Sequence, residues 1–270
     1  MIVGVIGGSG FYELLSNVKE EKVNTIFGSA RVYLGEVGGR KVAFIPRHGK
    51  GHVAPPHSIN YRANILALRM VGVERVIASN AVGSLRENVD PGSVVIPHDF
   101  IDFTKNRVYT FFDGKTKIKI GNREVSGVVH ISMTPSPYCP ELRQILIETA
   151  REEGLKVFDK GVYVCTEGSR FETAAEIKAF RVLGGDLVGM TGVPEVVLAR
   201  ELAMCYATVC VVTNYAAGIM GSRKLTHTEV KEIFNKRIGD IKRVVIKAIE
   251  RIPEERKCFC SKVLEGAIVE

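Results

Sequence analysis

The sequence has no uninterrupted apolar segment long enough to cross a bilayer. Its N-terminus also lacks the charged start, apolar stretch and small-residue cleavage site of a secretory signal peptide. These absences exclude a membrane-spanning protein and favour a cytoplasmic one with no membrane partner. The 270 residues, 46% of them hydrophobic, are enough to bury a sizeable core.

Motifs of nucleic-acid binding are missing as well. The net charge is +7, but much of the excess lies at residues 231–257, where acids and bases alternate at helical spacing. The chain has no platform of interleaved aromatic and basic residues. We therefore expect no nucleic-acid partner, and a positive field that attracts a small anion such as phosphate.

Neither of the common nucleotide-binding loops is present. The stretch "GVIGGSG" follows the first apolar run, so Gly7, Gly8 and Gly10 can turn tightly and offer backbone N–H groups to an anion. It matches neither G-x-G-x-x-G nor the Walker loop. The acid that would bind a ribose hydroxyl about 20 residues later falls among ordinary surface Glu and Lys residues, so a Rossmann dinucleotide site is not expected. A nucleotide cofactor is therefore not expected. The loop by itself fits a plain strand-end turn as well as a phosphate site.

The densest cluster of potential ligands is "RHGKGHVAPPH" at residues 47–57. Its histidines, His48, His52 and His57, are separated by glycines and prolines, so no helix aligns them, and no carboxylate lies near them in the sequence. The forked guanidinium of Arg47 beside a second donor suits a dianion better. We expect phosphate here and no metal, with a structural role for His52 and His57 as the alternative.

We expect the six cysteines to be reduced, as thiols in the cytosol usually are. Four of them lie in apolar stretches typical of a core. Cys258 and Cys260 form a separate pair in "CFC". Two sulfurs do not complete a four-ligand zinc site, and no partner pattern is visible in the sequence. A disulfide is the alternative if the source is a hyperthermophile, a possibility that the single glutamine, Gln144, weakly favours.

Apolar runs and helical patterns alternate along the chain. This alternation predicts one α/β domain over residues 1–270, with a mixed β-sheet between helical layers. Several helical patterns end at a glycine: Gly72, Gly154 and Gly184. The expected strands are 2–6, 41–45, 75–79, 93–96, 161–165, 186–190 and 206–214, and the expected helices are 59–72, 139–154, 172–184, 193–204 and 226–252. Residues 104–127 are expected to be an excursion from the sheet.

Three of the predicted strands are followed by residues suited to anion binding. These are Ser9 after the first strand, Arg47 and His48 after the second, and Asn80 with Ala81 after the third. Ligands of open α/β sheets collect at the carboxyl ends of strands. We therefore expect these three segments to meet at one site.

The sequence resembles the trimeric type of purine nucleoside phosphorylases and methylthioadenosine phosphorylases. The motifs that carry the likeness span almost the whole chain in the family's order: "GVIGGSG", "PRHGKGH", "PPHSINYRAN", "SNAVGSL", "FETAAE", "GMTGVPEVVLARE" and "TNYAAG". Ser169 departs from the family's usual proline. The resemblance implies phosphorolysis of a purine nucleoside, without cofactor, in a trimer or a dimer of trimers.

The resemblance also implies site residues. His48 and Asn214 are the expected catalytic residues. Met190 is expected under the ribose, and Phe171 against the base. His130 is expected to reach the ribose pocket of a neighbouring subunit. The implied phosphate-binding residues are Ser9, Arg47, His48, Asn80, Ala81 and Thr191.

The identity of the base depends on Glu172 and on "TNYAAG", which supplies Asn214, Tyr215 and Ala216 to the expected substrate site. An ionised Glu172 accepts from N1–H of a 6-oxopurine but repels the N1 lone pair of adenine. Asn214 pairs with N7 and O6, whereas adenine-preferring members of the family usually have aspartate at 214 and 216. These residues favour inosine and guanosine as substrates.

His227 matches the position at which relatives that cleave oxopurine nucleosides place a histidine against the ribose 5′-hydroxyl. Relatives selective for methylthio nucleosides have an apolar residue there. The leading hypothesis is a 6-oxopurine nucleoside phosphorylase. Phosphorolysis of methylthioadenosine or methylthioinosine stays an alternative, as does a nucleoside- or anion-binding module without turnover.

Overall fold

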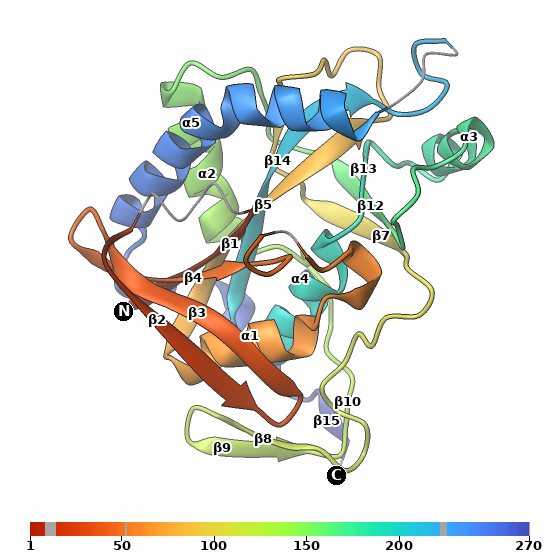
Figure 1. The fold of residues 1–270 in the computed structure, drawn as a ribbon. Coiled ribbons are helices and arrows are strands. Elements are labelled where there is room, and N and C mark those ends of the chain that lie inside the picture. The colour runs from red at the N-terminus through yellow and green to blue at the C-terminus, as the bar shows by residue number, and fades with distance from the viewer. Residues whose placement is uncertain (9–14, 52, 222–225, 270) are drawn as a thin grey trace.

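The computed structural model describes residues 1–8, 15–51, 53–221 and 226–269, with only the backbone at His227. Its centre is an 11-stranded mixed sheet in the order β11-β6-β14-β5-β1-β4-β3-β2, from which β13, β12 and β7 branch off at β5 (Figure 1). The strands of this sheet are β1 (Ile2–Gly7), β2 (Ser16–Thr25), β3 (Gly28–Val37), β4 (Arg40–Pro46), β5 (Val73–Ser84), β6 (Val94–Val95), β7 (Asp99–Phe103), β11 (Val157–Phe158), β12 (Val162–Thr166), β13 (Leu187–Gly189) and β14 (Cys205–Tyr215).

Helices cover both faces of this sheet (Figure 1). One buried cluster joins the sheet to α1 and α4, and a second joins the opposite face to α2 and α5. The helices are α1 (Tyr61–Met70), α2 (Pro140–Glu152), α3 (Ala174–Val182), α4 (Gly192–Glu201) and α5 (His227–Arg251), with short 3-10 turns η2 (Pro56–Ser58) and η3 (Phe259–Lys262). The predicted α/β fold with a mixed sheet between helical layers is confirmed.

The parallel strands β4 and β1 end side by side, next to the middle of β5. Pro46 of β4 lies opposite Gly7 of β1, and Ile6 lies opposite Ala78 of β5. The N–H of Arg47 donates to the carbonyl of Gly7 over 3.0 Å. β5 continues to Ser84, so Asn80 and Ala81 lie within this strand and not after it as expected. The residues that follow β4 and β1 are gathered beside this part of β5, at a place where ligands of α/β proteins can bind.

The expected helices are confirmed, and so are their glycine ends: Gly72, Gly154 and Gly184 all have positive φ. Residues 104–127 do leave the sheet, as expected, and they contain a hairpin of β8 (Lys117–Ile120) and β9 (Arg123–Ser126). Another small ladder pairs β10 (Val128–Val129) with β15 (Ile268–Val269). Within the described residues, no helix is both apolar and long enough to cross a membrane.

The sequence did not predict β2 and β3, which form an antiparallel hairpin at one edge of the sheet. β2 reads "SNVKEEKVNT" and is largely exposed, so it lacks the apolar run by which the other strands were recognised. Lysine and glutamate on an edge strand hinder its pairing with a further strand.

Candidate active site

Arg47 is the central cation at the place where β4 and β1 end beside β5. Its Nε and Nη2 donate to the two carboxylate oxygens of Glu195, over 2.5 and 2.9 Å, and its Nη1 donates to the carbonyl of Ser79 over 2.8 Å. Tyr206 donates its hydroxyl to the same carboxylate over 2.8 Å. Arg47 and Glu195 are both almost fully buried, so the pair fixes the guanidinium plane with little freedom to rotate.

This pairing keeps Arg47 charged. Burial alone lowers its pKa, but the Coulombic attraction and hydrogen bonds of Glu195 outweigh burial and hold the pKa of Arg47 above its usual value. Three of the five N–H groups of a guanidinium are used by Glu195 and Ser79. The arginine is therefore a fixed cation with donor capacity left for a ligand.

Beside Arg47, a chain of hydrogen bonds holds Asn80. Its Nδ2 donates to Thr208 over 2.7 Å, and its Oδ1 accepts from the hydroxyl of Thr191 over 2.8 Å. Thr191 precedes α4, and its backbone N–H lies 3.3 Å from the hydroxyl of Tyr163. Two predicted phosphate residues that are 111 positions apart thus touch directly.

Ala81 is the one exposed residue within β5, whose other residues are buried or half-buried. A Cβ added at Gly8, just after β1, would meet no atom of the described residues within 4 Å. The buried hydroxyl of Ser79 has no hydrogen-bond partner among the described residues. The exposure of Ala81 and the unpaired donor of Ser79 indicate room for a polar ligand beside this part of β5.

Of the other residues considered for phosphate binding, the structure describes His48 but not Ser9 or His52. His48 is half-buried, and its Nδ1 lies 2.9 Å from the carbonyl of Ala54. Ser9 and His52 lie outside the described residues. Arg47, Asn80, Ala81 and Thr191 are brought together, and the predicted role of Ser9 stays a prediction.

β13, β12 and the segment after β12 form one side of the candidate site, which we call its side wall. β13 pairs with β5 so that Val188 lies opposite Gly83, which places Met190, two residues further on, toward Ala81. The Met190 sulfur packs close to Gly168. Phe171 is half-buried in this same segment.

Glu172 lies on this wall and is held by Thr166. The Thr166 hydroxyl donates to Glu172 Oε1 over 2.6 Å, which leaves Oε2 for another partner. Burial raises the pKa of Glu172 above its usual value, although the hydrogen bond from Thr166 opposes the shift.

A β-bulge sets the orientation of the Asn214 side chain. The register between β14 and β5 shifts between Val212 and Asn214, after which Asn214 lies opposite Gly83. A Cβ on Gly83 would come 3.1 Å from Asn214 Nδ2, so glycine leaves the space that the amide uses. The amide accepts from Thr213 over 2.8 Å and donates to the carbonyl of Tyr215 over 3.0 Å, which leaves one donor and one acceptor position open.

A cavity of about 440 Å³ adjoins Asn214. Asn214, Tyr215, Ala216 and Gly218 line it from β14 and the following loop, and Glu229 lines it from α5. The hydroxyl of Tyr215 is occupied by Asp90, at 2.8 Å. Tyr215 therefore lines the cavity without offering a free hydroxyl toward Asn214.

Of the predicted substrate-binding residues, His130 does not lie near Asn214, and the placement of the His227 side chain stays a prediction. His130 is exposed and follows β10, and its N–H donates to the carbonyl of Ala267 over 2.7 Å. β10 and β15 lie at the bottom of Figure 1, whereas β5 and β14 end at the top. His227 begins α5, but its side chain lies outside the described residues.

The sequence did not single out Glu195. It lies in "VPEVVLARE", where a charged residue in an otherwise apolar start of a helix was the available signal, because a buried carboxylate needs a partner. Its partner, Arg47, is 148 residues away.

Comparisons with known proteins agree over nearly the whole chain. A family model described as the phosphorylase superfamily matches residues 2–250. A probable 6-oxopurine nucleoside phosphorylase of Korarchaeum cryptofilum is 60% identical over 262 residues, with 97% of both chains covered. A 6-oxopurine nucleoside phosphorylase of Pyrococcus furiosus is 53% identical over 266 residues, with 98% of both covered.

A similar solved structure is a methylthioadenosine phosphorylase sourced from an antarctic soil metagenomic library. It is 36% identical, has a TM-score of 0.88, and the match covers 99% of this chain and 92% of that one. The chain therefore belongs to the phosphorylase superfamily, in its group of purine nucleoside and methylthioadenosine phosphorylases, and is an enzyme of the pentosyltransferase type.

Proposed function

We propose that the protein is a 6-oxopurine nucleoside phosphorylase. Phosphate attacks C1′ of inosine or guanosine, the glycosidic bond breaks, and the products are ribose 1-phosphate and the free base. The relatives at 60% and 53% identity have this name. The observation that carries the proposal is Asn214, whose amide has one donor and one acceptor position open beside a cavity.

Phosphate is proposed to bind between Arg47, His48, Asn80–Ala81 and Thr191, with Ser9 as a further donor. The fixed guanidinium supplies charge, and the open space at Ala81 and Gly8 admits the anion to backbone N–H groups. As the glycosidic bond breaks, positive charge builds on the sugar. A phosphate held beneath C1′ stabilises that charge and becomes the nucleophile, so positioning and electrostatics supply the catalysis.

The departing purine gains negative charge, which Asn214 and Glu172 are proposed to stabilise for an oxopurine. The open acceptor of the Asn214 amide takes a proton-bearing N7, and its open donor meets O6. The free Oε2 of Glu172 accepts from N1–H. Met190 would lie under the ribose and Phe171 against the base, with Tyr215 and Ala216 completing the wall.

A substrate panel with and without phosphate tests the proposal. We expect phosphate-dependent cleavage of inosine and guanosine to exceed that of adenosine and methylthioadenosine. Replacing Asn214 by Asp should raise the adenosine-to-inosine ratio of kcat/KM by about 10-fold or more, because the new carboxylate repels O6. A phosphate-independent reaction, or an unchanged ratio in the variant, contradicts the assignment.

Methylthio-nucleoside phosphorolysis is the second candidate, favoured by the methylthioadenosine phosphorylase of the same fold. The two candidates differ at the 5′ pocket, for which His227 is the proposed determinant. Under the first function, His227→Val should slow cleavage of 5′-hydroxyl substrates selectively. Under the second, methylthio substrates should be the better ones and should be little affected.

We also propose that the enzyme is a homo-oligomer, either a trimer or a dimer of trimers, in which His130 completes a neighbouring subunit's ribose pocket. His130 is exposed and follows β10, which lies at the opposite end of Figure 1 from the end of β14, and this supports the arrangement. Mixing an inactive Asn214→Ala chain with an inactive His130→Ala chain tests it. Shared sites should recover activity in the mixed oligomer, and independent sites should not.

A further inference from the structure

Arg107 is a buried arginine whose side chain the roles proposed so far do not use. It lies in the segment after β7 and is 8% exposed. Its Nε donates to Glu167 Oε1 over 3.2 Å, and its Nη2 donates to the carbonyls of Thr166 and Glu167 over 3.2 and 2.7 Å. Its Nη1 donates to the Tyr61 hydroxyl over 3.1 Å and to the carbonyl of Val193 over 2.7 Å. The protein thus uses all five N–H groups of the guanidinium, so Arg107 acts through the segments that it holds.

The contact with Val193 reaches the phosphate side of the candidate site. Val193 lies two residues after Thr191 and two residues before Glu195, which pairs with Arg47. Its φ of −118° and ψ of 131° are extended, so the start of α4 is irregular at this residue. Arg107 therefore fixes the backbone between two residues of the proposed phosphate site.

The contacts with Thr166 and Glu167 reach the base side of the site. The Thr166 carbonyl accepts from Arg107, while the Thr166 hydroxyl donates to Glu172 over 2.6 Å. The Glu167 carboxylate also accepts from the two backbone N–H groups that precede Arg107 in the chain. The segment before Arg107 and the end of β12 therefore hold each other from both directions.

Tyr61 extends this network to the loop that follows β4. Tyr61 begins α1, and its hydroxyl accepts from Arg107 and donates to the carbonyl of Pro56 over 2.8 Å. Pro56 lies two residues after Ala54, whose carbonyl lies 2.9 Å from His48 Nδ1. One guanidinium thus connects this loop, the start of α4 and the segment that leads to Glu172.

We propose that Arg107 is a positioning residue that keeps the phosphate-binding and base-binding parts of the site at a fixed separation. The inference rests on the proposed function, from which it takes the roles of Thr191 and Glu172. Phosphate must reach C1′ of a nucleoside whose base is held by the other part, so this separation sets how closely the attacking oxygen approaches. Lysine cannot replace Arg107, because an ammonium lacks the planar fork that reaches all these partners.

Arg107→Lys tests the proposal, with Arg143→Lys as the matched control. Arg143 is a half-buried arginine of α2. It donates to the carbonyls of Ile96, Pro97 and Asp159, outside the proposed site. In Arg107→Lys we expect the KM for phosphate to rise and kcat to fall by about 10-fold or more each. The adenosine-to-inosine ratio of kcat/KM should rise as well, because Glu172 is held less firmly. Arg143→Lys should lower Tm and leave all three kinetic quantities near their native values.

Two milder variants separate the sides of the network and keep the test valid if Arg107→Lys does not fold. Tyr61→Phe removes the hydroxyl between Arg107 and Pro56. It should raise the KM for phosphate by about 3- to 10-fold, the effect of one hydrogen bond, and leave the adenosine-to-inosine ratio unchanged. Thr166→Val removes the bond to Glu172 and should raise that ratio by a similar factor with the KM for phosphate unchanged.

A lower Tm in Arg107→Lys with a native KM for phosphate and a native ratio overturns the proposal and leaves Arg107 a purely structural residue. A native KM for phosphate in Tyr61→Phe does the same for the link to the loop after β4. If the native enzyme cleaves methylthioadenosine in preference to inosine, the proposed function fails. The KM for phosphate measured with methylthioadenosine then still tests the role of Arg107.

Discussion

Breaking the buried ion pair of Arg47 and Glu195 should lower the stability of the protein, and added phosphate should restore part of that stability. Glu195→Gln keeps the shape but removes the charge, and it turns an N–H group toward a guanidinium that can only donate. Loss of one partner of a buried ion pair costs about 3–5 kcal/mol. For a chain of this size each kcal/mol lowers Tm by about 2–4 °C, so the expected fall is on the order of 10 °C.

The decisive measurement is Tm with and without phosphate. At about 100 times its Kd, a ligand stabilises a protein by about 2.7 kcal/mol. If phosphate binds at Arg47, the dianion replaces the lost carboxylate charge, and the increment should be larger in Glu195→Gln than in the native enzyme.

Glu201→Gln is the matched control. Glu201 is also buried in α4, but it accepts from Thr110 and from the backbone of Phe111 and pairs with no arginine among the described residues. It should lose stability and keep the native phosphate increment. An increment in Glu195→Gln no larger than the native one would refute the placement of phosphate at Arg47.

Two further predictions concern the base. Because burial raises the pKa of Glu172, lowering the pH through that pKa protonates the carboxylate, removes an acceptor for N1–H of inosine and adds a donor for N1 of adenine. The adenosine-to-inosine ratio of kcat/KM should therefore rise as pH falls, and in Glu172→Gln this ratio should no longer depend on pH. A ratio that does not change with pH in the native enzyme would count against the role of Glu172 in base selection. Gly83→Ala should lower kcat/KM for inosine by about 10-fold, because its Cβ would lie 3.1 Å from Asn214 Nδ2. Gly239→Ala in α5, whose Cβ would meet only the end of Arg243 at 3.9 Å, should leave activity unchanged, and equal rates in both variants would exclude steric aiming of Asn214.

The proximity of Arg47 and Asn80 could be predicted from the sequence, because it follows directly from strand order. Arg47 and Asn80 each come just after an apolar run, and parallel strands bring such residues to one edge whatever the detailed packing. Helix ends were predictable for a similar local reason, since Gly72 and Gly184 adopt the positive φ that a helix end favours.

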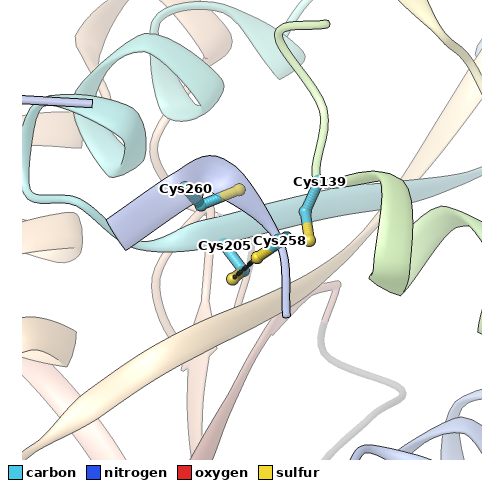
Figure 2. A group of neighbouring side chains, drawn as sticks. All are labelled: Cys139, Cys205, Cys258 and Cys260. Carbon is cyan, nitrogen blue, oxygen red and sulfur yellow. Dashed lines mark hydrogen bonds between the residues drawn. The ribbon is translucent and has the colours of Figure 1, made fainter. Parts of the chain in front are cut away.

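What could not be predicted depends on contacts between distant segments. Glu195 meets Arg47 across 148 positions, and Cys139 meets Cys258 only because α2 and η3 pack beside β14 (Figure 2). No periodicity or spacing in the sequence predicts such long-range contacts. The aim of Asn214 also depends on a β-bulge, which is a property of the paired strands and not of either strand alone.

The exposure of Ala81 within an otherwise covered strand means that folding and catalysis make separate demands on that position. The residues around it on β5 are buried, so the sheet forms without help from the Ala81 methyl group. Under the proposed function, a bulkier residue there would occupy the space proposed for the anion and leave the core unchanged. If phosphate binds beside Ala81 as proposed, a large side chain at this position should abolish activity without unfolding the protein.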